Sequence, residues 1–340
     1  MMTNDFVQIG VVAKNEIIKS VRGRKFLIST AIVFLVFLLI TGLQMATNGW
    51  DNIKDIGQFM SVYFNMFPMV ITLVVALLAS VAIVSEFEER TALILFTRPI
   101  RRTSIFVGKI LSCLIIEALL ILAYYIMSSI VAYVKLGTVP SDLLTSYGIS
   151  ILYAFAASGI AFIISSFFKK GSVCTIISVL ILVIIIPISS SMIGSDDGEN
   201  WYMLDQSADT LYTCVPEYVD QYNKTAEQFK KVVDSAITIL EGFTDKGLDP
   251  AKDWLAEFIQ SPDYLALDAE HQESILKMFM FLNTGADGNL KAMISVLKFM
   301  SVGVLPHMDY PDVGKAALVL LVWGIVSYFV AWIRFVRREF

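Results

Sequence analysis

The sequence predicts an all-α polytopic membrane protein with six transmembrane helices. Of its 340 residues, 56% are hydrophobic and only 17% are charged, and the mean hydropathy is +0.69. Several windows of about 20 residues contain no charge, which is the length that an α-helix needs to cross a bilayer. Apolar residues outside these windows recur at intervals of three and four, which favours helices there too.

Six apolar windows define the predicted spans, which are Phe26–Met45, Phe64–Val84, Ile110–Val134, Leu143–Phe168, Ser172–Ile193 and Ala316–Ile333. The first window follows a basic segment, as the apolar core of a signal peptide does. It is about twice as long as such a core, so we expect it to be retained as a membrane span.

Lysine and arginine are unevenly distributed among the connections between these spans. Five lie in the N-terminal arm, five in residues 85–109, two in residues 168–171 and three in the C-terminal tail, whereas the alternate connections carry only Lys54 and Lys135. Basic residues in short loops remain on the cytosolic side of a membrane. The sequence therefore predicts a multi-pass protein of the plasma membrane with both termini in the cytosol.

A long segment between spans five and six divides the chain into three predicted parts, residues 1–193, 194–312 and 313–340. This segment contains 21 Asp and Glu residues against 8 Lys residues. Its apolar residues follow helical spacing, so we expect an extracytoplasmic domain of four or five helices. Its acidity fits either a solvated, repulsive surface or the recruitment of a basic substrate.

Residues 85–109 place eight charges in a short connection between two long apolar runs. An acidic cluster opens this connection, an apolar helical stretch at residues 93–96 follows, and Pro99 separates that stretch from a basic end. An amphipathic segment of this kind can lie along a membrane surface and present one face to a soluble partner.

Several catalytic patterns are missing from the sequence. Neither G-x-x-x-x-G-K-[ST] nor H-E-x-x-H occurs, so the chain lacks the phosphate-binding loop of P-loop ATPases and the zinc-binding helix of metalloproteases. The spans contain no His and no Asp, which leaves intramembrane proteolysis without its usual residues. The three cysteines and two histidines form neither a disulfide framework nor a metal-binding pattern. We expect no catalysis by this chain and no cofactor bound to it.

The pattern E-x-E-x-x-T-x-x-x-L-x-T-R-P-I-x-R-x-x-x-x-x-G-K runs from Glu86 to Lys109. It resembles the turn after the second span in permeases of the ABC exporter class with the type V fold. The resemblance extends to the amphipathic arm from Val7 to Phe26 and to the order of six spans, about two-thirds of the chain. The insertion at 194–312 departs from the compact helical re-entry that many members have there.

The resemblance implies that the turn, at about residues 85–103, is a coupling helix that docks into a groove on a separately encoded P-loop ATPase. ATP and magnesium would bind to that ATPase, and a second permease copy, identical or different, would complete the transporter. The residues expected to contact the ATPase are Glu86, Glu88, Glu89, Thr91, Leu95, Phe96, Arg98, Pro99 and Arg102. Buried apolar side chains would anchor the turn and charges at the rim would set its register. Alternatively, the charges serve membrane topology alone.

The N-terminal arm carries an apolar stripe of Val7, Val11, Ile18 and Val21, with five basic residues towards span one. Anionic headgroups attract basic residues near a membrane surface by about 1 kcal/mol each. We therefore expect an elbow helix that lies on the membrane, with contact to the ATPase as a secondary role.

Glu117 is the only acidic residue within the predicted spans. Helical spacing places Cys113, Glu117, Tyr124 and Ser128 on one face of span three, so Glu117, Tyr124 and Ser128 are candidates for a translocation pathway between two subunits. A structural hydrogen bond from Glu117 to a neighbouring span is the other interpretation. Small residues at four-residue spacing in span four predict close helix packing, and Pro68 and Pro187 are expected to disrupt their spans.

These observations together predict the membrane-spanning permease subunit of an ATP-driven ABC exporter. Its expected partners are the ATPase, a second permease copy and the lipid bilayer, and no nucleic acid. Two alternatives remain: a non-transporting subunit that transmits ATPase motion to its outer domain, and an ion-coupled secondary transporter that uses Glu117. The sequence leaves the transported substrate open.

Overall fold

The described part of the chain consists of helices and their connections, with no strand. The computed structural model describes residues 5–47, 49–88, 101–194, 202–246, 260, 262–265, 272 and 308–337. The chain divides into two compact units. The membrane unit comprises Met1–Val219 and Tyr310–Phe340, and the insertion unit comprises Asp220–Asp309.

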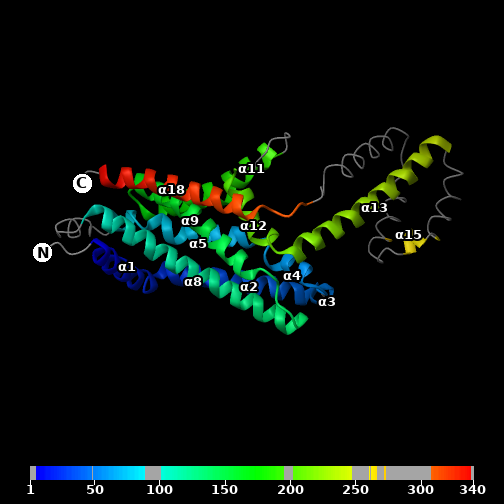
Figure 1. The fold of residues 1–340 in the computed structure, drawn as a ribbon, viewed down its shortest axis with the longest axis horizontal. Coiled ribbons are helices and arrows are strands. Elements are labelled where there is room, and N and C mark those ends of the chain that lie inside the picture. The colour runs from blue at the N-terminus through cyan, green and yellow to red at the C-terminus, as the bar shows by residue number, and fades with distance from the viewer. Residues whose placement is uncertain are drawn as a thin grey trace. The chain divides into compact units, whose positions relative to one another are not determined.

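All six predicted spans are confirmed as helical runs that are long and apolar enough to cross a membrane. Four are continuous or nearly so and appear in Figure 1 as α2 (Arg24–Ala46), α8 (Arg102–Leu136), α9 (Leu143–Phe167) and α18 (Val313–Arg337). The arm forms α1 (Asp5–Val21), and a short α3 (Gly49–Asn52) follows span one. The all-α polytopic class predicted from the sequence is therefore correct.

The second span is interrupted and begins earlier than predicted. It consists of α4 (Ile56–Tyr63), α5 (Phe67–Leu78), the 3-10 helix η1 (Ala79–Val81) and α6 (Val84–Glu88). Asp55 starts it, since its side-chain Oδ1 accepts a hydrogen bond of 2.8 Å from the backbone N–H of Gln58. Pro68 lies in the first turn of α5, where a missing N–H costs nothing.

The fifth span contains a π-helical segment next to its proline. Its parts are α10 (Gly171–Val179), the π-helix η2 (Leu180–Ile185) and α11 (Ile186–Gly194). At the end of η2, the N–H of Ile186 bonds to the carbonyl of Ile181, five residues back. Pro187 follows directly and has no N–H to donate, so the disruption predicted at this residue is confirmed.

Helix α9 lies at the centre of the membrane unit and packs against α5, α8, α10, α12 and α18. Its small residues Ser150, Ala154, Ala157, Ser158, Ala161 and Ser165 are all buried. At Gly159 an added Cβ would lie 2.9 Å from the Cβ of Ser327, so the backbones of α9 and α18 approach closely there. Ser158 and Tyr328 also share a hydrogen bond of 2.6 Å between these helices. The predicted close helix packing is confirmed.

The structure places α12 (Leu204–Thr213) in the membrane unit, whereas the sequence assigned residues 194–312 to an outer domain. One face of α12 is apolar and buried, with Leu204, Ala208 and Leu211 against α9 and α18. The hydroxyl of Ser146 donates a hydrogen bond to the carbonyl of Leu211. The compact insertion unit therefore begins at Asp220.

Within the insertion unit the described residues are fewer. Helix α13 (Pro216–Lys246) runs into it, and a short α15 (Pro262–Leu265) follows. Asn223 forms a two-point clamp with the backbone of Met308, donating from Nδ2 at 3.0 Å and accepting at Oδ1 at 2.9 Å. This clamp holds the first helix of the unit to its last residues. The other predicted helices lie outside the described residues.

Candidate functional site

The charged turn is described at its two ends only. Its acidic start forms α6, which contains Glu86 and Glu88, and its basic end leads into α8 at Arg102. The remaining predicted coupling residues lie outside the described residues and stay predictions: Glu89, Thr91, Leu95, Phe96, Arg98 and Pro99. The two ends come together with α1, and we call this side of the membrane unit the arm end.

A buried ion cluster ties three helices at the arm end. Lys109 of α8 is 1% exposed, and its Nζ donates to Oε1 of Glu16 in α1 at 2.8 Å and to Oε1 of Glu86 in α6 at 3.0 Å. Lys19 of α1 contacts the same Glu86 oxygen at 3.2 Å. Two lysines thus balance two carboxylates, which offsets the cost of burying these charges.

A glycine permits this close approach of α1 to α8. A Cβ at Gly108 would lie 2.7 Å from Cγ1 of Val12 and 3.2 Å from the carbonyl oxygen of Ile9. Val12 and Ala13 are buried on this side of α1, while the predicted stripe of Val7, Val11, Ile18 and Val21 is exposed. The arm therefore has two apolar faces, of which the sequence analysis recognised only the exposed one.

Both terminal helices and span five are also attached at the arm end. Arg102 donates from Nη1 to the carbonyl of Val336 in α18 at 2.9 Å. Glu88 accepts a hydrogen bond of 3.0 Å from the backbone N–H of Gly171 at the start of α10. Arg101 pairs with Asp5 of α1 at 2.8 Å. The charges at the base of the turn thus contact three other helices of the same chain, α1, α10 and α18.

These contacts change the interpretation of Glu86. The sequence analysis placed Glu86 at the rim of an ATPase-docking surface, but its side chain is largely buried and bonded to lysines of the chain itself. The sequence contained an indication of this contact, because Glu86 and Lys109 lie at opposite ends of the same turn and carry opposite charges. Sequence reasoning missed Glu16 and the pairing of Lys109 with both carboxylates, because pairing partners cannot be read from charge counts.

The candidate pathway residues of span three lie inside the bundle of one chain. Tyr124 stacks on Phe67 of α5 with ring centroids 4.1 Å apart, and its hydroxyl donates to the carbonyl of Tyr63. Ser128 donates to the carbonyl of Tyr125 in its own helix at 3.0 Å. Cys113 and Glu117 are also buried, so this face packs against neighbouring helices of the same chain. The role of Glu117, Tyr124 and Ser128 in a translocation pathway stays a prediction.

Among the described acids of the membrane unit, Glu117 is the one whose two carboxyl oxygens are both buried without a hydrogen-bond partner. It is 0% exposed, and neither carboxyl oxygen has a hydrogen-bond partner among the described residues. The structural hydrogen bond considered from the sequence is therefore not formed with any described residue. Burying a polar group without a hydrogen-bond partner costs free energy. A conformational change that gave the Glu117 carboxyl a partner would remove that cost, so Glu117 is a candidate functional position.

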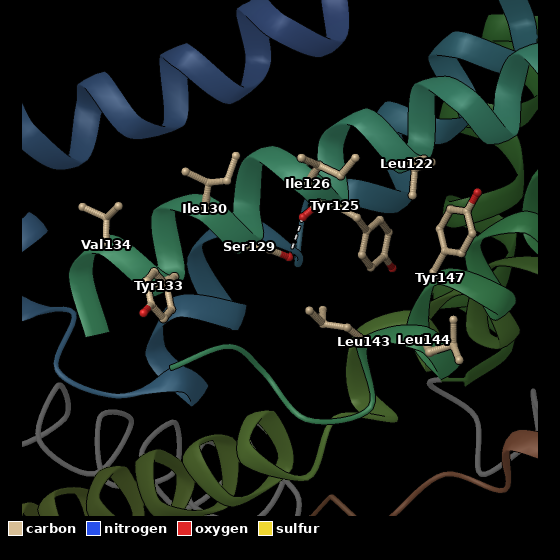
Figure 2. Close-up of a pocket in the computed structure, with 10 residues that line it drawn as sticks. All are labelled: Leu122, Tyr125, Ile126, Ser129, Ile130, Tyr133, Val134, Leu143, Leu144 and Tyr147. Atoms are coloured by element: carbon tan, nitrogen blue, oxygen red, sulfur yellow. Dashed lines mark hydrogen bonds between the residues drawn. The ribbon is translucent and has the colours of Figure 1, made fainter. Parts of the chain in front are cut away.

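A groove of about 490 Å³ lies between α8 and α9, towards the C-terminal end of α8 (Figure 2). It is lined by Leu122, Tyr125, Ile126, Ser129, Ile130, Tyr133, Val134, Leu143, Leu144 and Tyr147. The dashed line in Figure 2 is the hydrogen bond of 2.7 Å from Ser129 Oγ to the carbonyl of Tyr125. The lining residues include no Asp, Glu, His, Lys or Arg, and none of them is one of the predicted pathway residues.

The described residues offer little for cofactor chemistry. Within them no group of three or more His, Cys, Asp or Glu side chains lies together in a way that could hold a metal ion. At the arm end, the charged groups that the structure describes bond to one another and connect helices.

Comparison with known proteins identifies the family. The profile of the family described as "ABC-2 family transporter protein" matches residues 11–201, which is more than half of the chain and includes the arm, the charged turn and the first five spans. A search of curated proteins gave no match. The chain belongs to the ABC-2 family of transporter proteins and is a membrane-spanning permease subunit of an ABC transporter, without an ATPase of its own.

Proposed function

We propose that this permease exports a substrate from the cytosol, driven by ATP hydrolysis in a separately encoded P-loop ATPase. The observation that carries the proposal is the ion cluster of Lys109, Glu16, Glu86 and Lys19 at the base of the charged turn. A turn that served only membrane topology would need no buried attachment to three helices. Family membership supports association with an ATPase subunit.

In this proposal the turn is the coupling element. Leu95 and Phe96 insert into a cleft of the ATPase, and Glu89, Thr91, Arg98 and Pro99 shape the contact around them. ATP and magnesium bind to the ATPase rather than to this chain. When the ATPase closes, the displacement of the turn passes through Glu86 and Lys109 into α8 and α1, and through Glu88 and Arg102 into α10 and α18.

The uneven distribution of Lys and Arg supports a cytosolic location for the arm end and both termini. A second permease copy, identical or different, completes the pathway in the plasma membrane. Orientation is tested by cysteines placed near Asn283 and near Arg101 in a Cys214→Ser background. An impermeant reagent applied to intact cells should label the first and spare the second, and the reverse pattern would contradict the orientation.

Coupling is tested by replacing Leu95 and Phe96 with Ser. Each lost apolar anchor weakens the ATPase contact by about 1.5–3 kcal/mol if it is fully buried, which is about tenfold or more in affinity. The control is Leu144→Ser, an exposed leucine of α9. Release of the ATPase from purified complexes by the turn variants alone supports the proposal, and unchanged complexes in both variants would contradict it.

One observation favours the ion-coupled alternative, namely the unpaired Glu117 inside the bundle. A secondary transporter would move its substrate in vesicles that contain the permease without ATPase and carry an ion gradient. An ATP-driven exporter would not. A non-transporting subunit would move no substrate in either preparation.

A further inference from the structure

The groove between α8 and α9 runs along the part of the chain that lies at membrane depth. Its lining on α8 extends from Leu122 to Val134, within span three, and on α9 from Leu143 to Tyr147, at the start of span four. Twelve residues of α-helix advance about 18 Å. One leaflet contributes about 15 Å of the hydrocarbon core of a bilayer. The groove in Figure 2 is therefore about as long as one leaflet is deep.

One end of the groove is marked as the headgroup level. Lys135 follows Val134 directly, and its Nζ lies 5.1 Å from the ring centroid of Trp50. Tyr133 lines the same end and is 64% exposed. Trp and Tyr gather at membrane–water interfaces, and lysines near helix ends extend towards them. The groove thus opens near the headgroups and continues into the hydrocarbon of the leaflet away from the arm end.

The inner polar groups of the lining are bonded within the chain. The hydroxyl groups of Tyr125 and Ser146 lie 2.6 Å apart, and the Tyr147 hydroxyl donates to the carbonyl of Ala118 at 3.2 Å. The one serine of the lining bonds to its own helix at 2.7 Å. An occupant of the inner groove therefore meets carbon atoms, and only the exposed Tyr133 offers a hydroxyl, at the open end.

The size of the groove fits one hydrocarbon chain. A methylene group is about as large as a water molecule, which occupies about 30 Å³ in the liquid. The groove of about 490 Å³ would hold about 16 such groups. Its length of about 18 Å also suits a single extended chain rather than a compact ligand. The uncharged lining excludes ligands that would place a charge inside the groove.

The lining does not suit a helix of a second permease copy. A helix with its side chains is about 10–12 Å wide, so a piece about 18 Å long needs more than about 1,000 Å³. Close packing of spans also depends on small residues, as where Gly159 of α9 meets α18. Ser129 is the one small residue of the groove lining, and the others are Leu, Ile, Val and Tyr.

The shape of the groove gives a chain more contacts than the surrounding bilayer surface does. Lipid tails are as apolar as leucine, so apolarity alone would not hold a lipid on a span. A chain between two helices touches side chains on both sides, with Ile126 and Ile130 from α8 and Leu144 from α9 (Figure 2). Van der Waals attraction adds up over these contacts.

We propose that the groove between α8 and α9 is a binding site for one acyl chain of a membrane phospholipid. The chain has about 14–18 carbons, its methyl end lies near Leu122 and Tyr147, and the hydroxyl of Tyr133 donates to its ester carbonyl. The site depends on the fold of spans three and four alone, so it does not rest on the proposed export function.

The test is native mass spectrometry of the full chain in dodecyl maltoside. The delipidated chain is mixed with 1-palmitoyl-lysophosphatidylcholine, which carries one 16-carbon chain. About one molecule should remain bound per chain, and its 8-carbon analogue should be retained about tenfold less, because it fills only half of the groove. Retention of several molecules without a plateau near one, or equal retention of both probes, would overturn the proposal.

A pair of variants locates the binding. Ser129→Phe places a ring in the groove and should lower retention of the 16-carbon probe by about tenfold, because no room is left beside the ring. The control is Leu119→Phe, which adds a ring at an exposed position of the same helix outside the groove. Equal retention in the two variants would contradict the site. If Ser129→Phe instead dissociates a dimer and leaves lipid retention unchanged, the occupant is a second copy and the proposal fails.

Photolabelling of the unmodified chain needs no variant that could fail to fold. The probe is a phosphatidylcholine in nanodiscs with a diazirine at the end of a 16-carbon chain. It should label Leu122 and Tyr147 in preference to Leu119, which is exposed on the same helix less than one turn from Leu122. A diazirine next to the ester should label Tyr133. Equal labelling of Leu119 and Leu122, or the reverse order along the groove, would contradict the assignment.

Discussion

Buried charges at the arm end of the membrane unit are paired within the chain, whereas the partly buried carboxylates of α12 face no cation among the described residues; we call the side of the membrane unit that carries α12 the α12 end. Lys109 and Lys19 balance Glu16 and Glu86 across three helices. Asp205 and Asp209 have only tyrosines and each other. The paired charges hold helices together, whereas burial without a cation raises the pKa of Asp209 to about 7.

The comparison also explains why the two ends tolerate different changes. Removing one partner from a buried ion pair leaves an uncompensated charge and typically costs about 3–5 kcal/mol. Removing a partly buried acid such as Asp209, whose charge faces no cation among the described residues, relieves a cost instead. Substitutions at the arm end should therefore destabilise the fold, and a neutral substitution at the α12 end should stabilise it above neutral pH.

The largest effect is expected for Lys109→Met. This variant removes the buried lysine that both Glu16 and Glu86 contact, so it should lower stability by about 3–5 kcal/mol. The control is Lys135→Met in the same helix, which pairs with the exposed Asp51 at 3.8 Å and lies 5.1 Å from the ring centroid of Trp50; each contact is worth about 1 kcal/mol or less. Thermal unfolding in detergent, followed by tryptophan fluorescence, measures both.

A compensated variant sharpens this prediction. Adding Glu16→Gln and Glu86→Gln to Lys109→Met removes the stranded negative charges and should recover much of the lost stability. Equal losses in Lys109→Met and Lys135→Met would mean that the cluster at the arm end is no stronger than a surface pair. The contrast between the two ends would then fail.

Gly108→Ala should follow, with a loss of about 1–3 kcal/mol from overpacking. The added methyl group would meet Val12 and the carbonyl of Ile9, so α1 would have to move away from α8. Gly148→Ala in α9 is the matched control. Nothing lies within 4 Å of an added Cβ there, and a helical alanine should be neutral or slightly stabilising. Similar melting temperatures for the two variants would contradict the close approach.

Asp209→Asn should change the pH dependence of stability. Because the folded pKa is raised from 3.8 to about 7, the native protein loses stability as the pH rises between those values and remains at the lower level above them. The asparagine variant lacks this loss, so its apparent melting temperature should exceed that of the native chain by a few degrees at pH 8 and match it near pH 4. Parallel curves across this range would show that Asp209 is not buried as described.

The smallest effect is expected for Glu217→Gln, a partnered acid of the α12 end. The hydroxyl of Ser141 donates to Oε2 of Glu217 at 2.7 Å in an exposed setting. An amide oxygen can accept the same bond, so stability should change by no more than about 0.5 kcal/mol. A change in stability as large as that of Asp209→Asn at pH 8 would remove the distinction between the exposed and the partly buried acids at this end.

Much of the membrane unit could be predicted from the sequence, because hydropathy over about 20 residues reports directly on the bilayer. The predicted span Leu143–Phe168 and the helix Leu143–Phe167 almost coincide. The early start of span two was missed because Asp55, a polar residue at the edge of an apolar run, acts as a helix cap. Capping depends on local geometry that a hydropathy window averages out.

The partners of charged groups could not be predicted in the same way. The sequence indicated that Glu86 and Lys109 matter, but their contact crosses from α6 to α8 and also recruits Glu16 of α1. The two aspartates of α12 were counted with the acidic outer segment. Only the packing of Leu204, Ala208 and Leu211 against the membrane unit reveals that they are partly buried.

The π-helical segment of span five is a position at which a change of helical winding would rotate the rest of the span. A π turn holds an additional residue compared with an α turn, and each residue of an α-helix advances about 100° around its axis. If the segment Leu180–Ile185 rewound as regular α-helix, everything beyond it in α11 would rotate by about that angle relative to α10. Span five can therefore present a different set of side chains at one end while the other end stays attached to Glu88.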